Sequence, residues 1–169
     1  MSGRMVLIGA GSGALALLFL ILFLYLFVFS HQGPLQPIAF SHKTHVGINQ
    51  IPCLYCHQYA RKAAIAGIPS VEKCRNCHIV VLPFHPEVKK LLDYWAKKES
   101  IGWIKVTDLP DHVYFNHKRH IRAGIDCAIC HGAVEQMDRM YQPLNSEMGK
   151  CLECHRQRKV SIDCWTCHK

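Results

Sequence analysis

The chain has 169 residues and a formal net charge of +8, and its length predicts about one domain. Beyond an N-terminal apolar block, roughly 130 residues hold too little Leu, Ile, Val and Phe to build a core from side chains alone. This part also holds all 10 cysteines and all 12 histidines. A disulfide scaffold has no need of histidine, so the joint excess favours metal ligation. No basic run is interleaved with aromatic residues, so we expect no nucleic-acid partner.

The first expected element is a membrane-spanning helix. Residues Met5–Phe29 contain no charged side chain, and at about 1.5 Å per residue they give roughly 37 Å of helix, enough to cross a bilayer. A signal peptide has an apolar run of only about 7–15 residues. We therefore predict a single-pass anchor over residues 1–30 and a linker over 31–39. Arg4 precedes the apolar run and predicts a cytoplasmic N-terminus in a bacterial cytoplasmic membrane.

After the linker, every cysteine falls in a C-x-x-C-H motif, the signature of covalent c-type haem attachment. Two thiols three positions apart can bond the two vinyl groups of one porphyrin, and the next histidine then ligates the iron as its proximal ligand. Such attachment takes place outside the cytoplasm, so we expect a periplasmic or other extracytoplasmic domain. The propionates of five haems, about ten carboxylates, would offset the basic charge. The predicted thiols are Cys53, Cys56, Cys74, Cys77, Cys127, Cys130, Cys151, Cys154, Cys164 and Cys167. The predicted proximal ligands are His57, His78, His131, His155 and His168.

Two copies of the pattern F-x-H-K-x-H, Phe40–His45 and Phe115–His120, precede the first and third motifs. Positions i and i+3 of a helix share a face, so the two histidines of one copy can ligate two different irons and hold their haems close together. A second C-x-x-C-H motif follows each first one, after 21 residues in one copy and 24 in the other. The chain is therefore interpreted as a duplicated module, about 40–100 and 101–169, with a fifth motif appended. The predicted distal ligands from the two copies are His42, His45, His117 and His120.

The fifth distal ligand has several candidates. His85 lies just ahead of a predicted helix and is our first choice. Met148 is the alternative, and a thioether ligand would raise the potential of its haem. His112 and His31 are reserves that we interpret as ordinary polar residues. Met137 and Met140 are weaker candidates, because methionine more often packs in a core.

Between the modules, residues Pro86–Glu99 are predicted to form an amphipathic helix with Pro86 at its first position. Its apolar residues recur at i, i+3, i+4 and i+7; they are Val88, Leu91, Leu92 and Trp95. Residues 101–115 are expected to form an extended linker or a short hairpin, and the other spacings leave room only for short helices. The predicted fold is mostly α and irregular, a pentahaem cytochrome c domain over residues 40–169 with haems filling most of its interior.

This pattern resembles class III multihaem cytochromes of the c3 and c7 type. Over the whole chain it is similar to the pentahaem cytochrome c subunit of alternative complex III, a quinol:electron acceptor oxidoreductase. Besides the anchor and the five motifs, the resemblance is carried by Tyr94–Trp95, Val113–His117, Cys130–Val134 and Met148–His155. It implies an iron–sulfur subunit and polytopic quinol-binding membrane subunits as neighbours. It also implies a monohaem cytochrome c, a terminal oxidase or another acceptor downstream.

These features predict an electron-transfer subunit of a respiratory or photosynthetic complex, which is not an enzyme by itself. Ten histidines on ten axial positions leave no iron open to a substrate, and no constellation of catalytic acid and base is present. A catalytic multihaem reductase for small oxyanions, which keeps such a position open, is therefore less favoured. The alternative that we retain is a stand-alone quinol dehydrogenase resembling the membrane-anchored tetrahaem cytochromes, with His31 and Lys43 near the membrane surface.

Overall fold

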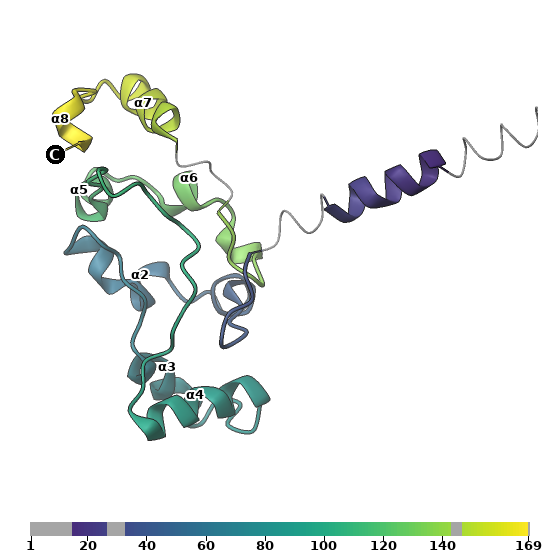
Figure 1. Ribbon diagram of the computed structural model, residues 1–169. Coiled ribbons are helices and arrows are strands. Elements are labelled where there is room, and N and C mark those ends of the chain that lie inside the picture. The colour runs from purple at the N-terminus through teal and green to yellow at the C-terminus, as the bar shows by residue number, and fades with distance from the viewer. Residues whose placement is uncertain (1–14, 27–32, 143–146, 169) are drawn as a thin grey trace, which may run out of the picture. The chain divides into compact units, whose positions relative to one another are not determined.

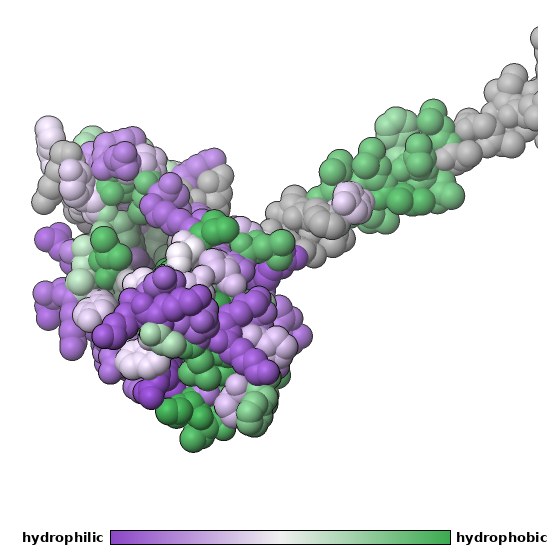
Figure 2. Space-filling view, turned by 60° about the horizontal axis from the view of Figure 1, so that its bottom comes forward, coloured by the Kyte–Doolittle hydropathy of each residue, from purple (hydrophilic) through white to green (hydrophobic). Residues whose placement is uncertain are grey.

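The computed structural model describes residues 15–26, 33–142 and 147–168. The chain divides into two units, Met1–Gly33 and Pro34–Lys169. In the first unit, residues 15–26 form a helix whose side chains are apolar apart from one tyrosine and all exposed (Figures 1 and 2). The predicted anchor extends past this helix at both ends, into residues outside the described ranges. Within those ranges, no helix combines the length and the apolar character that crossing a membrane requires.

The second unit consists of short helices joined by irregular segments (Figure 1). Its described residues contain no β-strand, only an isolated antiparallel bridge between Val113 and His168. This confirms the mostly helical and irregular fold for the part of the chain that the structure describes. The helices in chain order are η1 (Lys43–Ile48), α2 (Cys53–Cys56), η2 (Gln58–Arg61), α3 (Val71–His78), α4 (Pro86–Lys97), α5 (His117–Arg122), α6 (Cys127–His131), η3 (Val134–Gln136), α7 (Met148–Gln157) and α8 (Cys164–Cys167).

The helix between the two predicted modules, α4, begins where the sequence predicts and ends two residues early. His85 is its N-cap residue and Pro86 its first residue, where the missing amide hydrogen of proline costs nothing. At the other end, Lys98 adopts a left-handed conformation with φ of 57° and stops the helix. The helix buries Val88 and Leu91, two of the four residues in the predicted apolar pattern.

The side-chain core of the second unit is small, as its composition predicts. Ile38, Leu91 and Ile101 form one buried cluster. Other apolar side chains pack against it while remaining partly exposed; they are Val71, Cys74, Tyr94 and Trp103. The cluster joins α3 and α4 to the segments on either side of them. It lies next to one C-x-x-C-H motif, that of α3.

The segment after α4 is an extended linker, not a hairpin, because residues 101–110 form neither helix nor strand. The side chain of Gln36 holds it in place. The Gln36 Oε1 atom accepts a hydrogen bond from the Ile104 amide at 2.8 Å, and Gln36 Nε2 donates to the Ile104 carbonyl at 2.9 Å. One amide side chain thereby satisfies both backbone groups of a residue that has no regular secondary structure.

Candidate haem-ligand sites

The five C-x-x-C-H motifs lie on five separate short helices. The helices α2, α3, α6, α7 and α8 each carry one pair of cysteines about one turn apart, so both thiols of a pair project from the same side of their helix. No motif cysteine forms a disulfide, and each is exposed or half-buried. None of the pairs is enclosed in the side-chain core, so the thiols are available for covalent attachment.

Three of the motif histidines face a histidine from an F-x-H-K-x-H turn. The ring centroids of His45 and His78 are 6.0 Å apart. The rings of His117 and His131 are 6.3 Å apart and nearly parallel, with an interplanar angle of 4°. The rings of His120 and His155 are 6.1 Å apart. Residues distant in the sequence are thus brought together in pairs that share one separation.

This separation fits two imidazoles on opposite sides of one metal ion. An imidazole nitrogen lies about 2.0–2.1 Å from a bound transition metal, so two nitrogens in line across it are roughly 4 Å apart. Each ring centre lies about 1 Å beyond its nitrogen, which gives a centroid distance on the order of 6 Å. The chemistry of the donors also fits haem, because imidazole is an ordinary axial ligand of haem iron.

Hydrogen bonds to backbone carbonyls orient most of these rings. A carbonyl only accepts, so each Nδ1 below carries the proton and donates it, which leaves Nε2 of the neutral ring free to bind a metal. In the motif histidines, Nδ1 donates to the carbonyls of Gly67 (from His57, 2.7 Å), Val81 (from His78, 3.0 Å) and Ser161 (from His155, 2.7 Å). In the turn histidines, it donates to the carbonyls of Ser41 (from His45, 2.8 Å), Ala64 (from His117, 2.8 Å) and Asn116 (from His120, 2.9 Å).

The remaining turn histidine, His42, lies beside His57. Burial, and then the positive charges of His57 and His45, lower the pKa of His42 to about 4. Its Nδ1 atom is buried and has no hydrogen-bond partner among the described residues. The first turn therefore supplies one histidine to the motif of α2 and the other to the motif of α3, as the i and i+3 spacing predicts.

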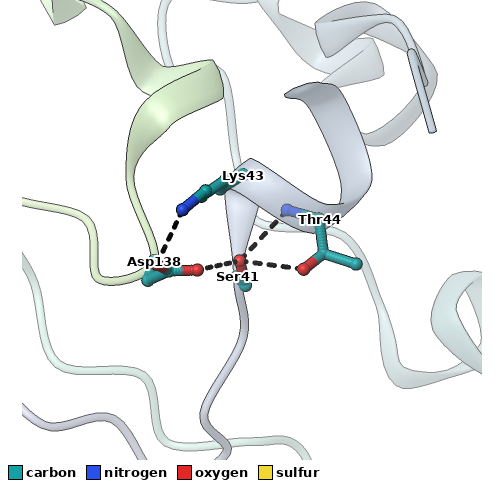
Figure 3. A network of polar contacts seen from close by, with 4 residues as sticks. All are labelled: Ser41, Lys43, Thr44 and Asp138. Carbon is teal, nitrogen blue, oxygen red and sulfur yellow. Dashed lines mark hydrogen bonds and ion pairs between the residues drawn. The ribbon is translucent and has the colours of Figure 1, made fainter. Parts of the chain in front are cut away.

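A polar network fastens the first turn to the second half of the unit (Figure 3). Ser41 Oγ donates to Asp138 Oδ1 at 2.7 Å and accepts from the amide of Thr44 at 3.1 Å. The Lys43 ammonium lies 3.7 Å from Asp138 Oδ2, and the Lys43 amide donates to the carbonyl of Met137 at 2.9 Å. Residues almost a hundred positions apart thus hold η1 against the segment that follows η3.

The second turn is fastened to the loop behind the first motif. The amides of His117 and Lys118 donate to the carbonyls of Ala64 and Ala63, at 3.0 and 3.2 Å. The Asn116 side chain caps α5 by accepting from the amide of Arg119 at 3.4 Å. The first turn is therefore bonded to residues of the second module, and the second turn is bonded to residues of the first module.

His85, the first choice for the fifth distal ligand, is the N-cap residue of α4, and no ring contact with a motif histidine is found for it among the described residues. His85 is exposed, and its Nδ1 accepts a hydrogen bond from the amide of Glu87 at 3.3 Å. An accepting Nδ1 puts the proton of the neutral ring on Nε2, the opposite of the arrangement in the other histidines. The proline after it explains this position, because His85 serves as the cap of a helix that begins at Pro86.

The methionine candidates differ in their exposure. Met148 is 61% exposed at the first position of α7, on the same helix as the fourth motif. Met137 is buried, with 4% exposure, and Met140 is half-buried. His31 lies outside the described residues.

His112, interpreted from the sequence as an ordinary polar residue, lies over the fifth motif histidine. Its ring centroid is 5.3 Å from that of His168, and the rings are 23° from parallel. A signal for this was present in the sequence. The two F-x-H-K-x-H turns are offset by 75 positions, and at that offset His112 corresponds to Pro37, so only the half with three motifs has this histidine.

Cysteines of different motifs influence one another electrostatically, and these neighbours give the order of the motif helices in space. Burial, and then a neighbouring sulfur, raises the pKa of several of these thiols. Cys56 is the neighbour of Cys74, Cys53 of Cys127, Cys154 of Cys130, and Cys167 of Cys151. The spatial order of the motif helices is therefore α3, α2, α6, α7, α8, with the motif that is second in sequence at one end (Figure 1).

Two comparisons with known proteins agree with this geometry. Residues 113–169, which contain the last three motifs, match the family described as cytochrome c7 and related cytochrome c. Over 161 aligned residues the chain is 29% identical to a protein of Nitratidesulfovibrio vulgaris named "Menaquinone reductase, multiheme cytochrome c subunit". The alignment covers 79% of this chain and 77% of that protein. Residues 113–169 are therefore similar to cytochrome c7 and related cytochrome c, and most of the chain is similar to a protein named as a multihaem cytochrome c subunit.

Proposed function

We propose that the chain is a pentahaem cytochrome c that relays electrons as a subunit of a quinone-linked membrane complex. The observation that carries the proposal is the pairing of motif histidines with turn histidines at 6.0–6.3 Å. Three independent pairs at one metal-sized separation, each next to a pair of available thiols, fit bis-imidazole haem sites. The c7-type match and the multihaem relative support the same assignment.

The residues of each site have separate roles. The two cysteines tether the porphyrin, and the two imidazoles hold the iron from both sides. A haem held by these residues would supply single-electron chemistry to each site. The turn and motif histidines would together occupy the ligand positions of the iron, which would leave none open to a substrate. The Nδ1 hydrogen bonds keep each ring in one orientation and one tautomer.

The spatial order of the motifs defines the proposed path of electrons through the chain. The H-x-x-H turns join the α2 site to the α3 site and the α6 site to the α7 site. Contact between Cys53 and Cys127, together with the hydrogen bonds of α5 to Ala63 and Ala64, joins the two halves. The α3 and α8 sites are then the two ends, where partner proteins exchange electrons with the chain. At the α8 end, Trp165 is 79% exposed within the fifth motif.

The partners follow from the relatives. The similar protein of Nitratidesulfovibrio vulgaris is named as a subunit of a menaquinone reductase, so the proposed complex contains a quinone site on another subunit. The resemblance to alternative complex III further suggests an iron–sulfur subunit and polytopic membrane subunits as partners in the proposed complex. The chain would be anchored by residues 1–30 in the cytoplasmic membrane, with its N-terminus inside and residues 40–169 outside. In alternative complex III the electrons leave quinol, whereas the relative's name describes transfer to menaquinone.

Purification of the chain from native membranes tests the proposal. We expect five covalent haems per chain by mass spectrometry and a fully low-spin spectrum. We also expect large subunits to co-purify, and we expect the purified complex to transfer electrons either from quinol or to quinone. A chain without haem would overturn the assignment. A lone chain that itself oxidises quinol would favour the stand-alone dehydrogenase instead.

A further inference from the structure

We propose that His112 is the distal ligand of the fifth haem, the one attached at Cys164 and Cys167. This inference rests on the proposed function and adds the tenth axial ligand to it. The two F-x-H-K-x-H turns supply four distal histidines, which face the motifs of α2, α3, α6 and α7. The motif histidine of α8, His168, is left over, and the turns contain no fifth histidine to serve it.

The ring of His112 is the one that meets His168. Their centroids lie 5.3 Å apart with an interplanar angle of 23°. The separation is shorter than in the other pairs by about 1 Å, which small rotations of the two side chains about their χ torsions can supply. His112 is exposed, and no other hydrogen bond holds its ring among the described residues.

The backbone fixes this pairing independently of the two rings. Val113 and His168 form the one antiparallel bridge of the described residues. The amide of Tyr114 donates to the carbonyl of Cys167 at 2.8 Å. His168 Nδ1 donates to the carbonyl of His112 itself at 3.3 Å, which directs the Nε2 atom of His168 away from this backbone. Residues 112–114 are therefore fastened along the C-terminal motif, fifty-odd positions away in sequence.

The same loop is shaped locally to present His112. The amide of Val113 donates to the carbonyl of Pro110 at 2.8 Å and closes a turn whose third residue is His112. Phe115 follows three residues later and begins the second F-x-H-K-x-H turn. One continuous segment thus supplies histidines to three sites that are successive in the spatial order, those of α8, α6 and α7.

The internal repeat points the same way. Pro37 stands at the position of the first module that corresponds to His112 of the second. Proline has no imidazole, and the first module has only two motifs to serve. The additional motif and the additional histidine therefore occur together, in the same half of the chain, as expected if they form one site.

The test uses the full chain, matured with its haems and purified from native membranes. For His112→Gly we expect five covalent haems, of which one becomes high-spin and binds carbon monoxide. Added imidazole should restore the low-spin spectrum, because it can enter the space of the missing ring. For His112→Met we expect a low-spin spectrum in which one haem has a raised potential.

Matched variants at the rival ligands make the result decisive. His85→Ala and Met148→Ala should leave all five haems low-spin. A fully low-spin His112→Gly protein would overturn the inference, and so would a high-spin haem that appears in either rival variant or in the unmodified chain. An unmodified chain without covalent haem would instead defeat the proposed function. The two failures are thus distinguished by the haem count.

Discussion

The two F-x-H-K-x-H turns, Phe40–His45 and Phe115–His120, hold their rings in almost the same geometry. In each turn the phenylalanine meets the first histidine edge-on, with centroids 4.9 Å apart in one and 4.8 Å in the other. It stacks on the second histidine at 4.3 and 4.4 Å, with interplanar angles of 28° and 29°. In both, the second histidine donates to the carbonyl four residues earlier. The motif alone is therefore enough to fix how its phenylalanine ring and its two histidine rings are arranged.

The surroundings of the two turns differ. The first turn continues into a π-helix, η1, and packs against η3, whereas the second begins an α-helix capped by Asn116. The first histidine of the second turn donates to Ala64, while the Nδ1 atom of His42 is buried without a partner among the described residues. A six-residue motif thus determines how the rings meet, and distant residues determine how each turn is held.

The largest expected effect comes from removing the same ring in each turn. His45→Ala and His120→Ala should each leave one iron with an open axial position, so one haem in five becomes high-spin in both variants. The high-spin fraction should be the same in the two variants because the rings are arranged in the same way in the two turns. Electron paramagnetic resonance of the purified complex measures the high-spin fraction. His45→Met, which keeps a ligand, is the control and should stay low-spin. A variant of either turn that stayed fully low-spin would break the equivalence of the two turns.

The next largest effect is a loss of stability that should differ between the two turns. A methyl group on Gly47 would lie 2.4 Å from the carbonyl oxygen of Glu135, so Gly47→Ala must push η1 away from η3. Overpacking of this kind costs about 1–3 kcal/mol. The equivalent position of the second turn is Arg122, an exposed residue, and Arg122→Ala should change stability by less than about 0.5 kcal/mol. Denaturant unfolding followed by haem absorbance measures both. Equal losses would show that the close approach of η1 to η3 is not what holds the first turn.

A smaller difference is expected between the polar residues that precede the first histidine of each turn. Ser41 and Asn116 are equivalent positions, and each accepts a hydrogen bond from an amide three residues later. Ser41 also bonds to Asp138 and to the hydroxyl of Thr44. We expect Ser41→Ala to cost about 1–2 kcal/mol and Asn116→Ala about 0.5–1 kcal/mol. The midpoints of denaturant unfolding give the ranking, and a larger loss from Asn116→Ala would contradict it. Ser41→Thr retains the hydroxyl and serves as the control.

The sequence predicted the local parts of this molecule well. The repeat offset of 75 positions identified both turns, and the apolar period with Pro86 located α4 to within two residues. These features depend on neighbours within one or two helical turns, where residue spacing determines geometry. The pairing of turn histidines with motif histidines at one separation agrees with the predicted ligands His45, His117 and His120.

The parts that could not be predicted depend on contacts between distant segments. His85 is predicted as a ligand from its position before a helix, and the structure shows that it caps this helix and that its Nδ1 accepts from the Glu87 amide. His112 is a reserve in the sequence analysis, where its extended surroundings favour an ordinary polar residue. Its pairing with His168 results from a backbone bridge across 55 residues, between Val113 and His168. The repeat offset shows that the second half has one additional histidine, but spacing along the chain does not show which segment this histidine meets.

The smallest effect concerns an ion pair of the first turn, between Lys43 and Asp138. Lys43 and Asp138 are 54% and 69% exposed in their side chains, so solvent screens their attraction and we expect a contribution below about 1 kcal/mol. Asp138→Asn retains an oxygen that can accept from Ser41 and should lose only the ionic part, a loss that disappears in high salt. Asp138→Ala also removes the acceptor and should cost more, at any salt concentration. Unfolding of both variants at low and high ionic strength separates charge from hydrogen bonding. If the two variants lost the same stability and responded equally to salt, charge rather than the Ser41 hydrogen bond would hold the first turn in place.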